Sequence, residues 1–460
     1  MTIDGLRAAT DKMREAGVPE LAVAVFARFH DQLRSAATGA IPEDTIDPLT
    51  DVPHLDDVRP DEDAVAAALG RTVVVKLNGG LGTSMGISGP KSALTVRDGL
   101  TFLDIIARQV LALRRRHGVQ TPLVLMDSFR TREQSLEILE RHPGLAVDGL
   151  PLDFLQNMEP KLRADDLGPV EWPQDPSLEW CPPGHGDIYV ALQTTGLLDA
   201  LRERGYRYAF LSNADNLGAT CDGGVPAWMQ REGIPYVAEV SARTRNDRKG
   251  GHLGVRKSDG RLVLRDSAMV AEGEDHFFQD TERHPWFHTN NLWVDLDVLA
   301  ARLAESDGIL GLPIIVNRKT VDPTRPDSTP VIQIESAMGA AVEVFDGSRA
   351  LAVDRSRFRP VKTTNELLLI RSDLYRLDED SVVQSTIDHD EPFVDLSKAY
   401  ALVDAFEERF PRGVPSIRGC ASLRVEGDTT FGGDVVCTGD VRVAADVTHV
   451  PDGTHLEGRA

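Results

Sequence analysis

The feature that most restricts the fold is a regular alternation of short apolar runs with helical patterns in the middle of the chain. Four runs are typical of strands because they are apolar and rich in β-branched residues: "RTVVVKLN" (71–78), "TPLVLMDS" (121–128), "YRYAFLSNADN" (206–216) and "IPYVAEVSA" (234–242). Two stretches each predict a single helix that ends at a glycine: "LTFLDIIARQVLALRRRHG" (100–118) and "DIYVALQTTGLLDALRERG" (187–205). The alternation predicts an α/β fold with a mixed, mostly parallel sheet, helices on both faces, and ligands at the carboxyl ends of the strands.

A glycine-rich loop, "KLNGGLGTSMGISGPKS" (76–92), continues the first of these strands and ends in Pro90 and Lys91. Its five glycines leave the backbone N–H groups open to a phosphate, and the lysine adds a mobile positive charge. A P-loop needs glycine directly before the lysine, and a Rossmann turn needs a shorter spacing and a helix directly after it, which is expected only near Thr101. A long nucleotidyltransferase loop that wraps a triphosphate fits better, with a surface turn that binds nothing as the alternative.

The bulk composition excludes several classes of partner. The 460 residues suffice for two or three domains, and the formal net charge of -22 repels nucleic acid and anionic lipid. The four cysteines show no C-x-x-C or zinc spacing, which is typical of a reducing compartment. The charged N-terminus has no apolar core segment, and no stretch is apolar enough to span a bilayer. We therefore expect a cytoplasmic protein with no nucleic-acid or membrane partner.

The last 45 residues or so follow a different, six-residue period. One column of mostly apolar positions is Leu423, Thr429, Val435, Val441 and Val447, and a second is Val425, Phe431, Cys437 and Val443. This period predicts a left-handed parallel β-helix, with an ordinary β-meander as the alternative. The open last turn of such a coil would offer a stacking surface for a homo-oligomer. The chain thus divides into an N-terminal helical segment and a Pro/Asp-rich, extended linker (1–62), a nucleotidyltransferase catalytic domain (63–392), and a C-terminal helix with the β-helix (393–460).

The glycine loop closely resembles that of eukaryotic-type UTP–glucose-1-phosphate uridylyltransferases, also called UDP-glucose pyrophosphorylases. Further segments resemble that family in the same order: "PPGHGDIYVAL", "LSNADNLGAT", "ARTRNDRKGGHLG", "HTNNLWVDL", "IIVNRKTVDP", "VIQIESAMGAA" and "SRFRPVKTTNELLLIRSDLY". The resemblance covers roughly residues 73–375, and the tail is also similar. It implies a Rossmann-like, GT-A-like nucleotidyltransferase fold. The N-acetylhexosamine pyrophosphorylases share only the looser glycine–proline–lysine framework.

The resemblance implies transfer of a uridylyl group from UTP to glucose 1-phosphate, which gives UDP-glucose and pyrophosphate. The sugar phosphate is already an anion, so the protein must supply alignment and charge neutralisation rather than a general base. Lys91 and Lys362 match the family's phosphate-contacting lysines, and Asp215 matches a Mg²⁺ ligand. The alternatives are solvated surface lysines and an aspartate that forms a turn.

The resemblance also assigns nucleotide and sugar contacts. The expected nucleotide-binding residues are Leu77, Asn78, Gly79, Gly80, Gln156 and Gly184. The expected sugar-phosphate-binding residues are His185, Asn213, Asn246, Gly251, Asn290 and Glu335. Gln156 is expected to read the uracil edge with its amide and Gly184 to approach the uracil with its backbone, although the stretch after Gln156 departs from the family pattern. A structural role is the alternative for His185, Glu335 and the Asn290–Asn291 pair, and Asn216 is expected to be a turn residue.

Other functions stay open at this stage. A broader UDP-sugar pyrophosphorylase would accept galactose, N-acetylhexosamine or other sugar 1-phosphates at the same site. A metal-dependent glycosyltransferase also combines a Rossmann-like sheet with an Asp–metal site, but its sugar-nucleotide donor has no free triphosphate for a long loop to wrap. A non-catalytic sensor of sugar nucleotides is disfavoured by the presence of Lys91, Asp215 and Lys362.

Overall fold

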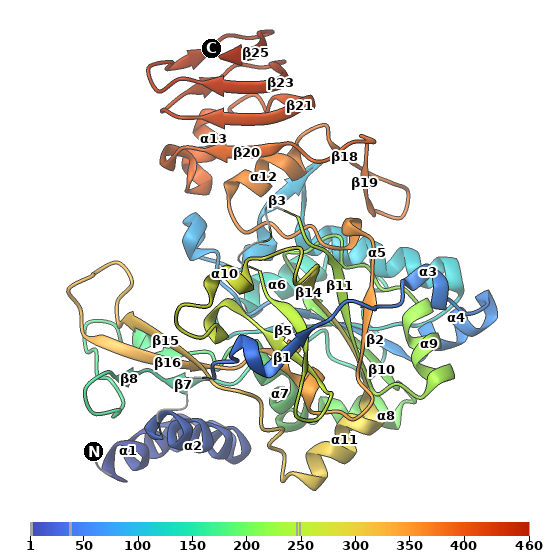
Figure 1. Cartoon of the computed structure of the whole chain (residues 1–460), viewed down its shortest axis with the longest axis vertical. Helices are drawn as coiled ribbons and strands as arrows, with labels where there is room; N and C mark the ends of the chain where they lie inside the picture. The colour runs from blue at the N-terminus through green and yellow to red at the C-terminus, as the bar shows by residue number, and fades with distance from the viewer. Residues whose placement is uncertain (1–2, 36–38, 245–246, 248–249, 460) are drawn as a thin grey trace.

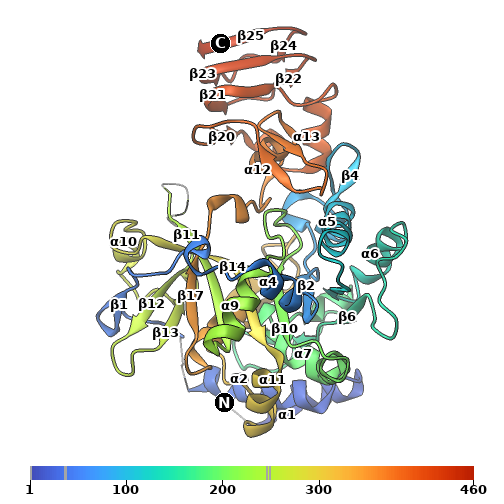
Figure 2. The same ribbon diagram turned by 90° about the vertical axis from the view of Figure 1, so that its right-hand side faces the viewer.

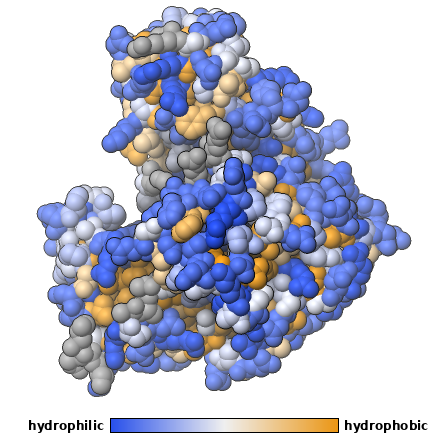
Figure 3. All heavy atoms as spheres, in the orientation of Figure 1, coloured by the Kyte–Doolittle hydropathy of each residue, from blue (hydrophilic) through white to orange (hydrophobic). Residues whose placement is uncertain are grey.

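The computed structural model describes residues 3–35, 39–244, 247 and 250–459. Figure 1 shows a large central sheet with helices around it, a pair of N-terminal helices at its base, and a C-terminal lobe of stacked strands at the top. Hydrophilic residues cover most of the face that is seen in Figure 3, and the hydrophobic ones form scattered patches between them. Within the described residues, no helix combines the length and the apolar character that crossing a bilayer requires.

The central sheet has ten strands and passes through the middle of the molecule. Its main path is β1 (Ile46–Pro48), β12 (His252–Arg256), β14 (Trp286–Asp295), β10 (Tyr208–Asn213), β2 (Thr72–Leu77), β5 (Leu123–Asp127) and β6 (Asp153–Leu155). Off this path, β13 (Leu262–Arg265) pairs with β12, and β11 (Tyr236–Ala242) joins β14 to β17 (Arg349–Ala352). Only β14, β13 and β1 run against the others in this sheet of the described chain. The predicted mixed, mostly parallel α/β architecture is therefore confirmed.

Helices cover both faces of this sheet (Figure 2). One face packs against α5 (Phe102–His117), α6 (Arg132–Leu139) and α9 (Gly224–Glu232), with α3 (Leu55–Val58) and α4 (Glu62–Leu69) lying on α9. The other face packs against α7 (Ile188–Thr194), α8 (Leu197–Glu203) and α11 (Leu296–Glu305). The sequence specifies α5 at both ends, because Thr101 and Asp104 form a capping box and Gly118 adopts the left-handed conformation that ends it.

The single helix predicted for residues 187–205 is wrong. The segment folds as α7 and α8, which Gly196 separates with a backbone φ of 73°. A left-handed residue interrupts the helical hydrogen-bond ladder, and glycine adopts that conformation at little cost. Gly196 therefore lies between the end of α7 and the start of α8.

The N-terminal segment folds as two helices, α1 (Ile3–Glu15) and α2 (Glu20–Arg34). They bury an apolar face, including Met13 and Phe26, against a small sheet of β15 (Ile315–Thr320), β16 (Pro330–Glu335) and β8 (Leu162–Arg163). The prediction that the following link is only extended is wrong, because it contributes β1 to the central sheet and also forms α3.

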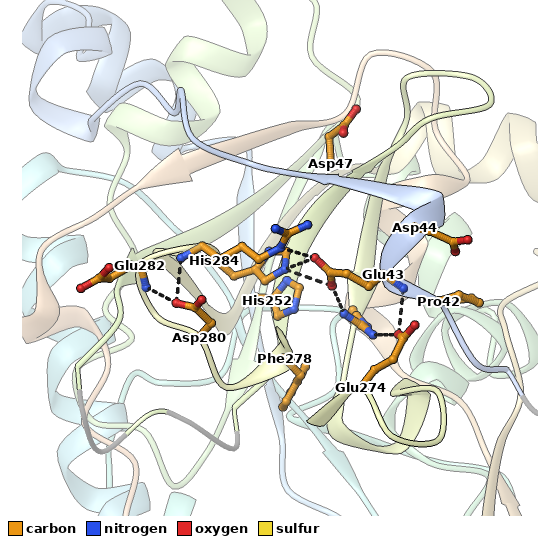
Figure 4. A network of polar contacts seen from close by, with 12 residues as sticks. Pro42, Glu43, Asp44, Asp47, His252, Glu274, Phe278, Asp280, Glu282 and His284 are labelled. Carbon is orange, nitrogen blue, oxygen red and sulfur yellow. Dashed lines mark hydrogen bonds and ion pairs between the residues drawn. The ribbon is translucent and has the colours of Figure 1, made fainter. Parts of the chain in front are cut away.

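A buried ionic network ties this link to the central sheet (Figure 4). The carboxylate of Glu43, just before β1, contacts the guanidinium groups of Arg265 and Arg283 and lies 3.1 Å from Nε2 of His284. Arg265 is fully buried and also donates to Glu274 over 2.6 Å. Glu43 therefore neutralises cations that come from β13 and from the segment before β14.

We expect Glu43→Gln to lower the free energy of unfolding by about 3 kcal/mol, because it removes one partner of a buried ion pair and leaves Arg265 with Glu274 alone. Urea unfolding followed by tryptophan fluorescence measures the change. Asp44→Asn is the matched control, since Asp44 is exposed and lies apart from the network in Figure 4. Equal unfolding midpoints for the two variants would contradict this role of Glu43.

The C-terminal lobe is built on a parallel sheet, as expected. Its strands are β20 (Phe393–Leu396), β21 (Ser416–Val425), β23 (Val436–Val443) and β25 (His455–Arg459), with β22 (Thr430–Phe431) paired in parallel to β24 (His449–Val450). Leu423 is in register with Val441, three six-residue periods later, and both are buried. The six-residue columns therefore do face inward, although Val447 is only partly buried.

The remaining elements connect these parts. They are α10 (Asp275–Phe278), α12 (Thr364–Arg371) and α13 (Val403–Arg409), with the paired strands β3 (Thr95–Arg97) and β4 (Leu100–Thr101), β7 (Glu159–Pro160) and β9 (Trp180–Cys181), and β18 (Tyr375–Leu377) and β19 (Val383–Ser385).

Candidate active site

The site forms where two neighbouring parallel strands end. Leu77 at the end of β2 is in register with Asn213 at the end of β10, so the glycine loop and the "NADN" turn start side by side. A short bridge between Asn216 and Pro360 brings the segment that carries Lys362 to the same place. Three segments that are distant in the sequence thus meet at the carboxyl edge of the sheet, where ligands bind in folds of this class.

The three predicted charged residues lie in contact. Lys91 Nζ donates to Asp215 Oδ2 over 2.8 Å, and Lys362 Nζ approaches the same oxygen at 3.3 Å. Burial by itself would raise the pKa of Asp215, but the two ammonium groups outweigh it and hold that pKa below its ordinary value. Two positive charges thus share one negative charge, so the site is locally cationic in a strongly acidic protein.

These charges line a cleft of about 390 Å³. Eleven of the predicted site residues line it: Leu77, Asn78, Gly79, Gly80, Lys91, Gln156, Gly184, His185, Asn213, Asp215 and Lys362. Five lining residues were missed: Leu81, Ser92, Met126, Pro182 and Ala214. Four of the five are within two positions of a predicted residue, and Met126 lies near the carboxyl end of β5, beside β2, so strand adjacency could have found it.

Three other predicted sugar contacts, Gly251, Asn290 and Glu335, do not line this cleft. Gly251 lies just before β12, and Glu335 ends β16 with its Cβ near Gly184. Asn290 adopts a φ of 62° within β14, a conformation that asparagine tolerates better than most residues. Asn246 falls outside the described residues. The roles assigned to these four residues stay predictions.

The side-chain amide of Asn78 forms hydrogen bonds that stabilise the glycine loop, so it is not free to bind a ligand in the cleft. Its Nδ2 donates to Asp127 Oδ1 and Ser135 Oγ, both over 2.7 Å, and its Oδ1 accepts from the hydroxyl of Ser92. This buried network connects both ends of the glycine loop to β5 and α6. The backbone N–H of Asn78 is engaged as well, because it donates to the carbonyl of Met126 over 2.8 Å. The nucleotide contact that the resemblance implies for Asn78 stays a prediction.

Gly79 leaves room for the amide of Gln156. A Cβ at position 79 would lie 2.6 Å from Nε2 and 2.7 Å from Oε1 of Gln156, closer than such atoms can approach. The glutamine side chain therefore lies directly on the backbone of the glycine loop. It makes no hydrogen bond to another described residue, so both amide atoms can serve a ligand.

We expect Gly79→Ala to raise the KM for UTP about 10-fold or more, because the new methyl group displaces Gln156 from the cleft. Initial-rate kinetics with each substrate varied in turn measures the effect. Gly80→Ala places the same methyl group at the next residue of the loop, where a Cβ meets no protein atom within 4 Å, so this variant leaves Gln156 in place and serves as the comparison. Equal KM values for the two variants would contradict the proposed packing.

Gly184 and His185 also line the cleft. Gly184 has a φ of 80°, and a Cβ there would lie 2.6 Å from the carbonyl oxygen of Ser336, so only glycine fits. His185 Nδ1 accepts the backbone N–H of Met338 over 2.9 Å, which places the ring proton on Nε2. Burial lowers the pKa of His185 to about 4, so the ring is a neutral hydrogen-bond donor at physiological pH.

Asn216 and Asn291 hold the framework behind the cleft. Asn216 donates to Asn291 Oδ1 and to the carbonyl of Arg357, and it accepts the backbone N–H of Arg359 over 2.8 Å. Arg357 in turn forms a bidentate pair with the buried Glu239 on β11. The expected turn role of Asn216 fits these contacts, which fix the segment that leads to Lys362.

Asp215 can also hold a divalent ion. Its Oδ1 is buried and has no hydrogen-bond partner among the described residues. Those residues contain no group of three or more acidic, histidine or cysteine side chains suited to a metal. An ion at Asp215 would therefore take its other ligands from phosphate oxygens and water, which suits Mg²⁺.

Known proteins share both the sequence and the fold. A family model described as UTP–glucose-1-phosphate uridylyltransferase matches residues 23–438. The enzyme of that name from Solanum tuberosum is 39% identical over 395 residues, 85% of this chain and 78% of its own length. The one from Hordeum vulgare is 37% identical over 438 residues, 93% and 89% of the two chains.

Two solved structures extend the likeness to three dimensions. A UDP-glucose phosphorylase from Trypanosoma brucei superposes with a TM-score of 0.92 at 40% identity, over 99% of this chain and all of its own. A UDP-glucose pyrophosphorylase from Leishmania major, in complex with UDP-glucose, gives a TM-score of 0.93 at 40% identity, over 100% and 99% of the two chains. Because the match spans nearly the whole length in sequence and in fold, this chain belongs to the UTP–glucose-1-phosphate uridylyltransferase family.

Proposed function

We propose that the cleft transfers a uridylyl group from UTP to glucose 1-phosphate by direct in-line displacement at the α-phosphorus. The observation that carries this proposal is the meeting of Lys91 and Lys362 on one oxygen of Asp215, at the end of a glycine loop. An attacking phosphate and a triphosphate repel each other, so their approach needs positive charge on both sides. Two ammonium groups from different segments supply it without any proton transfer.

We assign the nucleotide, the sugar phosphate, the hexose and the metal ion to different residues. The backbone of Leu77 to Gly80 and the amide of Gln156 bind the nucleotide, and the Nε2–H of His185 donates to the sugar phosphate or a hydroxyl. Asn213, Asn246, Gly251, Asn290 and Glu335 remain our candidates for the hexose. Mg²⁺ held by Asp215 would neutralise phosphate charge. The buried, unpartnered Oδ1 of Asp215 supports that assignment.

An assay of pyrophosphate release tests the reaction. With UTP, glucose 1-phosphate and Mg²⁺, the chain should release one pyrophosphate for each UDP-glucose formed. Galactose, glucosamine and N-acetylglucosamine 1-phosphates serve as a panel, and comparable rates with all of them would indicate the broader UDP-sugar pyrophosphorylase. Turnover of UDP-glucose without pyrophosphate would instead indicate a glycosyltransferase.

We also propose the finer features of the architecture. The eighteen-residue register of the C-terminal coils supports a left-handed β-helix, and the start of β20 at Phe393 supports a boundary between 63–392 and 393–460, with 1–62 as the N-terminal segment. The GT-A-like topology and homo-oligomerisation through the β-helix stay predictions. Sedimentation velocity of the full chain and of a form ending before Thr430 would decide the last point.

A further inference from the structure

A second cavity, separate from the cleft, lies on the side of the sheet that α5 and α9 cover. Its volume is about 200 Å³, and it shares no lining residue with the cleft. Aliphatic side chains form much of its wall: Val65, Leu69, Val74, Ile106, Val110, Leu113, Ala219 and Val382. The polar part of its wall includes Arg59, Lys76, Gln109, Arg116, His117, Asp222 and Asp380. The cavity is therefore amphipathic, with room for a small organic molecule.

Lys76 is the unusual member of this lining. It lies within β2, one of the central strands, and is 2% exposed. Its Nζ donates to Ser212 Oγ over 2.8 Å and to the carbonyl of Ala219 over 2.7 Å, and both partners are neutral. No carboxylate of the described residues forms an ion pair with it. Its other contact is with the ring of Phe210, whose centre lies 5.4 Å from Nζ, and this is weaker than the carboxylate that normally pairs a buried charge.

The acidic residues of the cavity are already neutralised. Asp222 pairs with Arg59 over 2.7 Å, and Asp380 pairs with Arg116 over 3.2 Å. Cys221 is held in its neutral thiol form, because burial raises its pKa. Two further carboxylates that act electrostatically on Lys76 are also engaged, Glu239 by Arg357 and Asp215 by Lys91 and Lys362. Each of these acidic groups therefore has another cation as its partner, and none forms an ion pair with Lys76.

We propose that this cavity binds a small organic carboxylate, with the carboxylate at Lys76 and a short aliphatic body against the apolar wall. A single negative charge supplies the carboxylate partner that Lys76 lacks, and the aliphatic lining favours an organic body over an inorganic ion. Lys76 directly precedes Leu77 and Asn78, and Ser212 directly precedes Asn213. Occupancy therefore acts on the two strand ends that carry the cleft.

Carboxylate binding at this site should depend on pH, because it is coupled to the protonation of Lys76. Burial lowers the pKa of Lys76 to about 7, so the free ammonium loses its proton as the pH rises through neutrality. A bound carboxylate raises that pKa, so binding is strongest below about pH 7 and takes up a proton above it. Between pH 6 and pH 8 we expect the affinity to fall about 10-fold.

Titration calorimetry of the full chain with hexanoate, at pH 6 and pH 8, tests the proposal. We expect one saturable site, with affinity about 10-fold weaker at pH 8. Proton uptake at pH 8 should appear as a dependence of the binding enthalpy on the buffer's ionisation enthalpy.

Lys76→Met should remove the binding. Val382→Phe, which narrows the cavity without touching Lys76, should also remove it and covers the case in which Lys76→Met fails to fold. Lys362→Ala should bind normally, because its change is confined to the cleft.

The outcomes separate this site from the proposed reaction. Absence of saturable binding at both pH values, or unchanged binding in Val382→Phe, would overturn the proposal. Loss of binding in Lys362→Ala would overturn it too, by placing hexanoate in the cleft. The Kd of UTP, measured with and without saturating hexanoate, should differ at least twofold in the unmodified chain and not in Val382→Phe. An unchanged Kd would contradict the coupling between the two sites.

Discussion

Lys362→Ala is expected to lower kcat about 10³-fold while the KM for UTP changes less than about threefold. In the structure, Lys362 reaches Asp215 from a different segment than Lys91, and more than half of its side chain is exposed. A lysine held this loosely in the free protein contributes little to ground-state binding. Its charge matters most when negative charge accumulates on the α-phosphate during displacement, so the loss should fall on kcat.

The control for this substitution is Lys319→Ala, which removes an exposed lysine of β15 that forms no ion pair within the described chain. It should leave both constants unchanged. Steady-state kinetics at saturating glucose 1-phosphate, with UTP binding measured separately by calorimetry, gives the split between binding and catalysis. Equal losses in kcat and in UTP affinity would make Lys362 a simple binding residue and contradict the account.

Asp215→Asn is expected to cost at least about 10³-fold in kcat at any Mg²⁺ concentration, because the amide keeps the size of the side chain but loses its charge. The substitution removes both the proposed metal ligand and the counter-charge that holds Lys91 and Lys362 together. Asp199→Asn is the matched control, since its carboxylate is exposed and pairs only with Arg202 among the described residues.

A second readout separates the metal role from the lysine-holding role. Mn²⁺ is a spectroscopic substitute for Mg²⁺, and its binding in the presence of UTP can be followed by electron paramagnetic resonance. We expect Asp215→Asn to weaken ternary Mn²⁺ binding at least 10-fold. Full activity of Asp215→Asn at saturating Mg²⁺, or unchanged Mn²⁺ binding, would refute the metal assignment.

The sequence predicted those parts of the fold that depend on local signals. The helix α5 begins near Thr101 and ends at Gly118 as expected, because the signals at both ends act within one turn of the chain. The inward-facing columns of the C-terminal coils were also predicted from the sequence, because each inward position repeats every six residues. By contrast, residues 187–205 were predicted as one helix, although in the structure the left-handed backbone of Gly196 divides the segment. Whether a glycine ends a helix depends on packing that one sequence does not reveal.

The parts of the site that lie at strand ends were also predictable, because the strands themselves have clear local sequence signals. Asn213 ends β10, Asp215 follows it closely, and the glycine loop follows β2, so parallel pairing brings them together. Met126 was missed although it lies near the end of the neighbouring β5, whereas Pro182 reaches the cleft from a loop outside this sheet. The anchoring of Glu43 by Arg265 and His284 was equally hidden, because these partners lie more than 220 positions away.

The most direct test of the central claim is a crystal structure with a non-hydrolysable UTP analogue, glucose 1-phosphate and Mg²⁺. We predict that the Nζ atoms of Lys91 and Lys362 lie about 3 Å from oxygens of the reacting phosphates, on opposite sides of the α-phosphorus, and that Asp215 coordinates the ion. A structure with either lysine turned away from the phosphates, or with the ion bound elsewhere, would contradict the account.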